Sequence, residues 1–430
     1  MIRKQSGMMS LLITAIMLVA ALMMTLGASR TVFYQIKRAD NELAARKAYW
    51  AAEGGLECAF TKASVDLDPA MLDDSIYPGY LASECKSPLA LSVLKYQLSG
   101  THYDVISEYS TQGIKKRLVK TMAFEGSAPG ALKSTADLYI YGSSAFSTPD
   151  PGVLGPEGWQ CVAINYKRIF SSHSGAANLG LIHGAAPYQG FDSQGFDCAD
   201  SHMTNVSSNS GYGADFVQTT GLDPFFDMFK RDKSDWNEVR TSSEWGFSTI
   251  NASKTVSISG VDYGIVENCG EKLASKVEAG VSHIWVEGSC ELTSGVGGGV
   301  EKLSEAFTSK GNPATFLMIH DGIFSIQGSM TFPGMLYHLT TDFTPVEALW
   351  GEFEANSHFG NAVYFPTLTK GNTVYFQRGA FVFSGGQILD TENLDAYFAQ
   401  SLNFAFNKDK IDDVTLVLPP VWIEGSWHDF

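Results

Sequence analysis

The sequence is poor in charge, and poorest in basic side chains. Charged residues make up 18% of its 430 residues, against about 25% in an average globular protein, and 46 acidic side chains outnumber 30 basic ones. The net charge of −16 argues against nucleic acid as a partner, because affinity for nucleic acids comes largely from Lys and Arg neutralising phosphates. The 42 glycines follow no three-residue period, which excludes collagen, and a hydrophobic content of 44% excludes a disordered chain.

Motifs of catalysis and metal binding are missing as well. None of the six cysteines forms a C-x-x-C pair, and none of the nine histidines has H-x-x-x-H or H-E-x-x-H spacing. There is no G-x-S-x-G nucleophile elbow and no Walker A motif. The nearest pairing of a histidine with an acid, His320-Asp321, directly precedes Gly322, where a turn accounts for it. We therefore expect no enzyme, no cofactor and no metal site.

Two groups of acidic residues are the remaining candidates for chemistry. The group near Cys198 comprises Asp192, Asp197 and Asp200. In a parallel β-helix such carboxylates can cleave carbohydrate, but that chemistry depends on their separation in space, which the sequence does not give. The second group comprises Asp227, Asp232, Asp235 and Glu238. It lacks the spacing and central glycine of an EF-hand, so we favour a solvated helical face over a Ca²⁺ site.

The first 60 residues contain no proline, and no charge occurs from Met8 to Ser29. A helix of this uncharged run would span about 33 Å, enough to cross a hydrocarbon core of about 30 Å. It is longer than the apolar region of a cleavable secretory signal. Small and apolar residues then continue at helical spacing, namely Leu43, Ala44, Ala48, Ala51, Ala52 and Leu56. The sequence predicts one long helix over residues 8–60, with Gly54-Gly55 as its first breaker; a plain signal anchor with a helical linker is the alternative.

The start and end of this helix carry a family resemblance. A short basic leader ends at Gly7, directly before the apolar run, and the helix closes on Ala51-Ala52-Glu53-Gly54-Gly55-Leu56-Glu57. This layout resembles type IV prepilin-like proteins, and the closing stretch is similar to the N-terminal region of PilX-type minor pilins. The resemblance implies cleavage after Gly7 by a prepilin peptidase and N-methylation of Met8. It also implies a helix that anchors the protein in the membrane and later packs in a filament core.

One position departs from the family. Counting Met8 as the first mature residue, the fifth is Leu12, where most pilins of this kind have a glutamate. That carboxylate is thought to pair with the amino terminus of a neighbouring subunit inside the membrane, where an unpaired charge is costly. The K-type minor pseudopilin of type II secretion also lacks this glutamate, so the departure implies a subunit at or near the pilus tip, or one that primes assembly. Sequence drift is the alternative.

Two signals in the sequence conflict about which side of the membrane holds the chain after the helix, which we call the body. Arg3 and Lys4 precede the apolar run, whereas five basic residues follow it, which by the positive-inside rule would place the body in the cytoplasm. The leader and the cysteines favour the outside instead, because an even number of widely spaced cysteines suits an oxidising compartment. We expect pairing of sequence neighbours, as Cys58–Cys85, Cys161–Cys198 and Cys269–Cys290; six free thiols in a cytosolic protein are the alternative.

The remaining chain reads as two regions after the leader (1–7) and the helix (8–60). Residues 61–133 should form a β-hairpin region packed on the helix, from strands at 103–109 and 114–124. Residues 134–430 form a Gly-rich β body with an insertion at about 146–250, in which short strands repeatedly end at glycine. Such strands favour a β-solenoid or β-helix over a β-sandwich. The fold class is therefore α+β, a long transmembrane, pilin-like helix followed by a mainly β body.

The function implied by the resemblance is that of a minor pilin of a type IV pilus, acting in pilus priming and in surface adhesion or aggregation. Its partners would be other major and minor pilins, the prepilin peptidase and an inner-membrane assembly platform, with a host or surface ligand left open. It would reside in the inner membrane of a Gram-negative bacterium with its body in the periplasm, and then in the pilus at the cell surface. A pseudopilin of type II secretion and a membrane-tethered β-helix carbohydrate-active enzyme are the alternatives.

Overall fold

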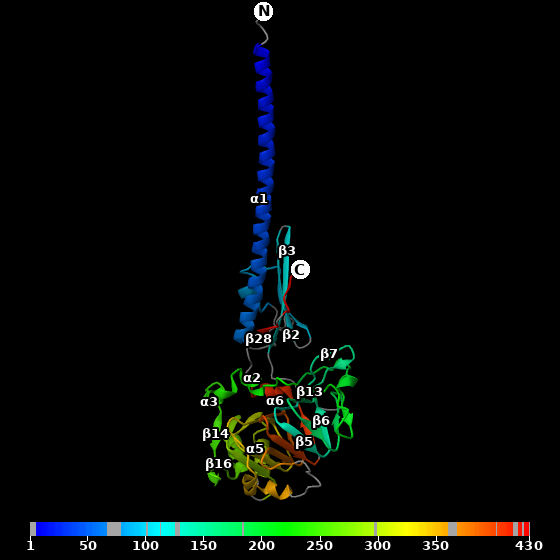
Figure 1. Ribbon diagram of the computed structural model, residues 1–430, viewed down its shortest axis with the longest axis vertical. Helices are drawn as coiled ribbons and strands as arrows, with labels where there is room; N and C mark the ends of the chain where they lie inside the picture. Colours follow the sequence, from blue (N-terminus) through cyan, green and yellow to red (C-terminus); the bar gives the residue numbers. More distant parts are fainter. Residues whose placement is uncertain are drawn as a thin grey trace, which may run out of the picture. The chain divides into compact units, whose positions relative to one another are not determined.

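The computed structural model describes residues 6–66, 79–99, 102–111, 113–124, 130–182, 185–295, 299–359, 368–400, 402–415, 420–423 and 425–429. The chain divides into two compact units, which Figure 1 shows coloured along the sequence. The first unit comprises residues 1–125 and 418–430, and the second comprises residues 126–417. The sequence-based boundary at residue 134 therefore lies too far along the chain. The C-terminal residues, which we expected in the body, belong to the first unit because they pair with its sheet.

Helix α1 (Ser6–Asp66) confirms the long apolar N-terminal helix of the α+β prediction. It extends beyond the predicted end at residue 60, because Gly54 and Gly55 lie inside the helix and do not break it. Up to residue 43 its described side chains are exposed. From there on, small residues form a buried stripe three or four residues apart, at Ala48, Ala52, Leu56, Ala59 and Ala63. Among the described residues, this is the helix whose length and composition would allow it to cross a membrane.

The stripe packs against an antiparallel sheet in the first unit. Its strands are β1 (Val93–Ser99), β2 (His102–Thr111) and β3 (Ile114–Phe124), with β28 (Pro420–Trp422) and β29 (His428–Asp429) both paired to β3. The predicted hairpin is thus formed by β2 and β3. Leu94, Val105, Leu118 and Met122 cover the alanines of the helix, and the Tyr96 hydroxyl donates a hydrogen bond to the carbonyl oxygen of Ala59. Small residues on the helix allow this close packing.

The second unit is built mainly from parallel sheets. Sheet I is parallel throughout, in the order β13 (Phe216–Gln218), β9 (Ile164–Tyr166), β4 (Leu132–Ser134), β25 (Gln387–Asp390), β22 (Gly334–Leu339), β19 (Thr315–His320), β17 (His283–Glu287), β14 (Ser248–Asn251). Sheet II has the order β10 (Phe170–Ser172), β5 (Asp137–Tyr141), β26 (Asp395–Ala399), β23 (Thr373–Arg378), β20 (Phe324–Gln327), β18 (Ser289–Thr293), β16 (Val261–Val266), β15 (Lys254–Ile258). Its β15–β16 pair is antiparallel and its other pairs are parallel.

Smaller sheets complete the unit. Sheet III has the order β12 (Asn205–Val206), β11 (Ala176–Asn178), β6 (Ser144–Thr148), β27 (Leu402–Ala405). The short strands β21 (Met330–Phe332) and β24 (Phe381–Phe383) pair in parallel, and β7 (Leu154–Gly155) and β8 (Gly158–Trp159) pair antiparallel. Parallel ladders of this extent differ from the antiparallel sheets of a β-sandwich. The expected short strands that end at glycine are present, for example β5, β17 and β20, which end directly before Gly142, Gly288 and Gly328.

The strand order does not follow the sequence order. The late strands β25 and β26 pair with the early strands β4 and β5, so that Gln387 lies opposite Leu132 and Asp395 lies opposite Asp137. The predicted insertion at 146–250 is not separate from the β body, because several of its strands belong to the sheets of the body. These strands extend sheets I, II and III. In sheet I, β9 pairs with β4 and β13 with β9; in sheet II, β10 pairs with β5; in sheet III, β11 pairs with β6. Two shorter segments leave the sheets, the described loops between β11 and β12 and the segment between β13 and β14.

The central strands of sheets I and II are buried on both faces, whereas the edge strands β14 and β15 are partly exposed. Every residue of β19 is buried: Leu317 and Ile319 point to the core enclosed by the sheets, and Phe316 and Met318 to the outer face. Parallel sheets covered on both sides characteristically show continuous hydrophobic runs without alternation, which explains the strands seen in the sequence. The coverings are short helices, namely α2 (Pro224–Phe229), η4 (Lys233–Asp235), α3 (Trp236–Thr241) and α6 (Lys408–Asp412) near sheet I, and η5 (Glu347–Glu352) and η6 (Glu354–His358) near sheet II.

The segment between β13 and β14, which we call the strap (residues 219–247), forms three short helices, α2, η4 and α3, in place of one continuous helix. Lys230 adopts a left-handed backbone conformation, with φ of 51°, and ends α2. Phe225 and Phe229, four residues apart, share the face that packs on sheet I, with ring centroids 4.7 Å apart. Phe226 points away and is 51% exposed, because one residue along a helix rotates the side chain by about 100°.

Candidate functional site

The predicted processing residues lie at the start of α1. Gly7 and Met8 belong to its first turns, and the side chain of Met8 lies outside the described part of the chain. Leu12 is 61% exposed and sits in an uncharged, mainly apolar surface that runs from Met9 to Leu26. Each square ångström of such a surface costs about 25 cal/mol in water. This half of the helix therefore requires lipid or other apolar helices around it.

Three disulfides join the cysteines as sequence neighbours. They are Cys58–Cys85, Cys161–Cys198 and Cys269–Cys290, and no described cysteine is free. Cys58–Cys85 links α1 to the short π-helix η2 (Ala82–Lys86). Cys269–Cys290 links helix α4 (Cys269–Glu278) to β18, and α4 itself packs beside α5 (Val300–Ser309). Cys269–Cys290 thus fastens a helix to a strand of sheet II, whereas Cys58–Cys85 joins two helices and Cys161–Cys198 joins two loops of the second unit.

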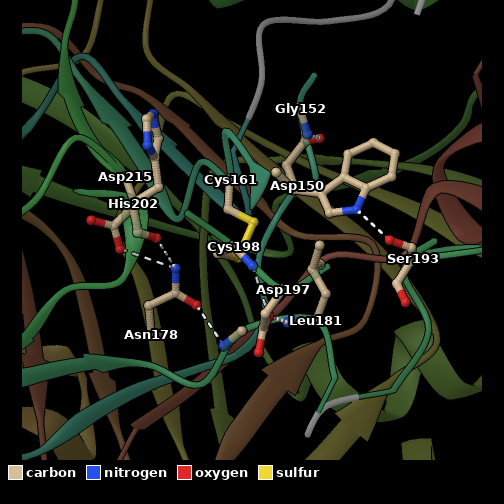
Figure 2. The surroundings of a disulfide bond; sticks show 12 residues. Asp150, Gly152, Cys161, Asn178, Leu181, Ser193, Asp197, Cys198, His202 and Asp215 are labelled. Atoms are coloured by element: carbon tan, nitrogen blue, oxygen red, sulfur yellow. Dashed lines mark hydrogen bonds between the residues drawn. A yellow bond between two sulfur atoms is a disulfide. The ribbon is translucent and has the colours of Figure 1, made fainter. Parts of the chain in front are cut away.

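Asp197, one of the acidic residues near Cys198, holds loop backbone in place beside the second disulfide (Figure 2). Oδ1 of Asp197 accepts hydrogen bonds from the amides of Leu181 at 2.6 Å and of Cys198 at 2.8 Å. Asp192 accepts from the amide of Gln194, and Asp200 begins the single turn η3 (Asp200–His202). The carboxylates of Asp192 and Asp197 therefore stabilise the loops through hydrogen bonds to backbone amides.

A buried carboxylate supports the same loops. Asp215 is fully buried, and its Oδ2 accepts hydrogen bonds from Asn178 Nδ2 and from the amide of Thr204, both at 3.1 Å. Oδ1 of Asn178 in turn accepts from the amide of Gly180 at 3.0 Å (Figure 2). A carboxyl group buried at this depth is tolerated because both of its oxygens accept hydrogen bonds, Oδ1 from the Thr204 hydroxyl and Oδ2 from the two donors above.

The acidic run of the strap also has structural partners. Asp223 caps α2 by accepting from the amide of Phe226, and Asp232 accepts from both the amide and the hydroxyl of Ser234. Glu238 forms an ion pair with Arg231 at 2.9 Å. Within the ranges that the structure describes, no group of three or more His, Cys, Asp or Glu side chains is arranged to hold a metal ion.

The structure shows a cleft of about 710 Å³ on the second unit, which the sequence analysis missed. Three segments line it: the strap, the loop after β22 and the turn between β25 and β26. The lining residues are Lys233, Ser234, Trp236, Thr340, Thr341, Asp342, Phe343, Thr344, Glu392, Asn393 and Leu394. Since these segments lie far apart in the sequence, no local spacing could have revealed them.

Buried hydrogen bonds fix the walls of this cleft. His320 is 1% exposed, with Nδ1 at 2.8 Å from Glu287 Oε1 and Nε2 at 3.1 Å from the Thr341 hydroxyl. The carboxylate of Asp321 accepts from the amide of Thr341 at 2.7 Å and also from the amide of Asp342. The beginning of the loop after β22 is therefore held on the sheet edge.

Two ion pairs neutralise charges at the rim of the cleft. Nζ of Lys233 lies 2.9 Å from Oδ1 of Asp390, whose Oδ2 accepts from the Tyr337 hydroxyl at 2.9 Å. Burial, followed by the nearby Asp390 charge, raises the pKa of Tyr337 well above its ordinary value, so this phenol remains a donor. Glu392 pairs with Lys167 at 2.9 Å. The site can therefore offer hydrogen bonds and aromatic surface with little uncompensated charge.

Comparison with known proteins adds little. No protein-family model and no curated protein matches the chain. A solved structure that is similar is that of the competence-associated pilin ComZ from Thermus thermophilus. The similarity covers 90% of this chain and 97% of that chain, at 10% sequence identity and a TM-score of 0.24. A TM-score this low carries no argument about fold or function, which must be inferred from the residues and the geometry described above.

Proposed function

We propose that this chain is a minor pilin of a type IV pilus, of the PilX-like kind, assembled through α1. The observation that carries the proposal is the contrast within this one helix. Its first half is apolar and exposed, and its second half packs small residues against an antiparallel sheet. A subunit of this shape gains stability when its exposed half moves from lipid into a bundle of similar helices, where packing of small and apolar residues replaces lipid contacts.

The processing and position of the subunit follow from residues 7 to 12. Cleavage after Gly7 would leave Met8 as the methylated first residue of the mature helix. Leu12 brings no carboxylate to pair with the amino terminus of a neighbouring subunit, so the protein suits the tip or an initiating complex, where one neighbour is missing. The three disulfides favour an oxidising location for the body, which is the periplasm before assembly and the cell surface afterwards.

The second unit is the part that would be displayed. Its stacked parallel ladders support a β-solenoid architecture, in which each pass of the chain adds a strand to the sheets and buries the previous pass. Such a body is rigid and offers turns and loops along its edges. Its role in this proposal is adhesion or aggregation, carried out by surface contacts, with no catalysis.

The mature N-terminus tests the processing step. The chain purified from the membranes of its native cells should have a mass that lacks residues 1–7 and includes one methyl group. Gly7→Leu should retain the leader. Gly27→Ala is the matched control, because a Cβ at Gly27 has no neighbour within 4 Å in the helix, and it should be processed normally. An unprocessed mass for the unmutated chain would contradict the proposal.

A deletion strain tests the biological role. Cells without this chain should lose surface pili or pilus-dependent adhesion, and expression of the unmutated chain should restore them. Normal pili together with normal adhesion would contradict the proposal. Normal pili with a loss of type II secretion would instead assign the chain to a pseudopilus.

A further inference from the structure

We propose that the cleft in the second unit binds a neutral oligosaccharide. The cleft encloses about 710 Å³, which lies within the range of about 300–1,000 Å³ of ordinary ligand sites. Its walls come from the strap, the loop after β22 and the β25–β26 turn, all within one compact unit. The aromatic and polar side chains of these walls fit a ligand with hydroxyl groups and apolar ring faces.

The aromatic wall of the cleft is rigid. Trp236 and Phe343 are both half-buried lining residues. The Trp236 ring is held by the rings of His320 and Trp285, with centroids 4.1 Å and 6.2 Å away. The guanidinium of Arg240 lies 5.5 Å from the centroid of the same ring. A fixed indole offers contact area at little entropic cost, and its N–H, which has no hydrogen-bond partner among the described residues, can donate to a hydroxyl group.

The polar groups of the cleft provide both donors and acceptors. Oδ1 of Asn393 accepts from Nη1 of Arg168, and this orients the side chain so that its Nδ2 remains available as a donor. The Asp342 carboxylate and the Thr344 hydroxyl have no side-chain hydrogen bond to any part of the chain that the structure describes, and they line the same cleft. A sugar hydroxyl donates and accepts at once, so it can satisfy an amide and a carboxylate together.

The charges of the cleft select a neutral ligand. Lys233 is paired with Asp390 and Glu392 with Lys167, which leaves the carboxylate of Asp342 as the uncompensated charge among the lining residues. The whole chain carries a net charge of −16. Phosphate, sulfate or uronate groups would therefore be repelled, because a like charge in the site and an acidic surface both oppose their approach.

Titration calorimetry on the full-length chain tests this inference. The chain is kept in lauryldimethylamine oxide, a detergent without a sugar headgroup, and titrated with cellohexaose, chitohexaose, mannohexaose and, as the anionic comparison, a heparin hexasaccharide. We expect saturable binding of at least one neutral hexasaccharide in preference to heparin. The test uses purified protein, so it is independent of pilus assembly and of the proposed pilin function.

Three variants locate the binding. Asn393→Asp keeps the size of the side chain and removes its N–H donor, so it should weaken binding about tenfold. Trp236→Leu should weaken binding at least as much, whereas Trp50→Leu, an exposed tryptophan of the other unit, should leave it unchanged. Thermal unfolding shows whether Trp236→Leu folds; if it does not, Asn393→Asp decides alone. Absence of binding of all three neutral hexasaccharides at millimolar concentration, tighter binding of heparin, or unchanged affinity in Asn393→Asp would overturn the inference.

Discussion

Gly55 of α1 lies so close to Ser107 of β2 that a Cβ added to the glycine would stand 2.4 Å from the serine Oγ. The same Cβ would lie 2.6 Å from Cδ1 of Leu91. Ser107 is fully buried, so its side chain has no free space to retreat into. This pair of residues therefore sets the distance between the helix and the sheet of the first unit. It also gives a physical role to the Gly54-Gly55 pair, which from sequence alone was expected to break the helix.

Gly55→Ala should destabilise the first unit. Overpacking at a rigid buried contact typically costs about 1–3 kcal/mol, more than the roughly 1 kcal/mol that alanine gains over glycine in a helix. Gly54→Ala is the matched control, since its Cβ would meet Leu89 Cδ1 at an ordinary 3.5 Å, and it should be neutral or stabilising. Thermal unfolding of both variants in detergent makes the comparison. Equal melting temperatures for the two variants would contradict the role assigned to Gly55.

Leu12→Glu should change where the protein enters the pilus. A carboxylate at this position can pair with the amino terminus of a neighbouring subunit, so the variant should appear along the shaft, whereas the unmutated protein should label filament ends. Leu11→Glu is the control, because it places the same charge on a different side of the helix, and it should reduce assembly. Immunogold labelling of sheared pili measures the positions. Abundant labelling of the shaft by the unmutated protein would refute the tip assignment.

Removal of the Cys161–Cys198 disulfide should lower the stability of the second unit. The bond closes a loop with a sequence separation of 37 residues, and loss of such a constraint costs about 3–4 kcal/mol. The double variant Cys161→Ser/Cys198→Ser should melt earlier than the unmutated chain. Differential scanning calorimetry with and without reductant is the measurement. If reductant leaves the melting temperature of the unmutated chain unaltered, the disulfides do not support the fold as described.

The stability of the second unit should depend on His338 at mildly acidic pH. Burial lowers the pKa of His338 to about 4. Its Nε2 lies 2.8 Å from the carbonyl oxygen of Gly322, and Asp321 and His320 are the titratable groups beside it. The unfolded chain takes up a proton near pH 6.5 and the folded chain only near pH 4, so stability falls as the pH drops through this window.

His338→Gln tests this dependence. It should flatten the change in melting temperature between pH 6.5 and pH 4, because the group that binds a proton preferentially in the unfolded chain is gone. His173→Gln, at an exposed position, should retain the slope of the unmutated protein. Melting temperatures measured at several pH values across the window make the comparison, and parallel curves for His338→Gln and the unmutated chain would show that another group is responsible.

The elements that could be predicted are those with local signals. The uncharged run before Arg30 and the small-residue stripe from Ala48 predict α1, and the strands of the β2–β3 hairpin are short range in sequence. The strand closure between β25 and β4 was not predictable, because it joins residues more than 250 positions apart, as Gln387 and Leu132 do. The cleft could not be predicted for the same reason, because its lining residues Trp236, Phe343 and Asn393 lie far apart in the sequence.

The amino-acid sequence alone determined the kind of molecule, a long apolar helix followed by a mainly β, acidic body, because helix length, hydrophobicity and strand-forming runs are local properties. The tertiary structure decided where that helix packs, which strands are neighbours and which side chains share a cleft. These are outcomes of long-range burial: the central strands of sheets I and II are buried on both faces, so they carry no alternation from which a register could be read. Only the folded chain shows that the C-terminal strands return to the sheet beside α1.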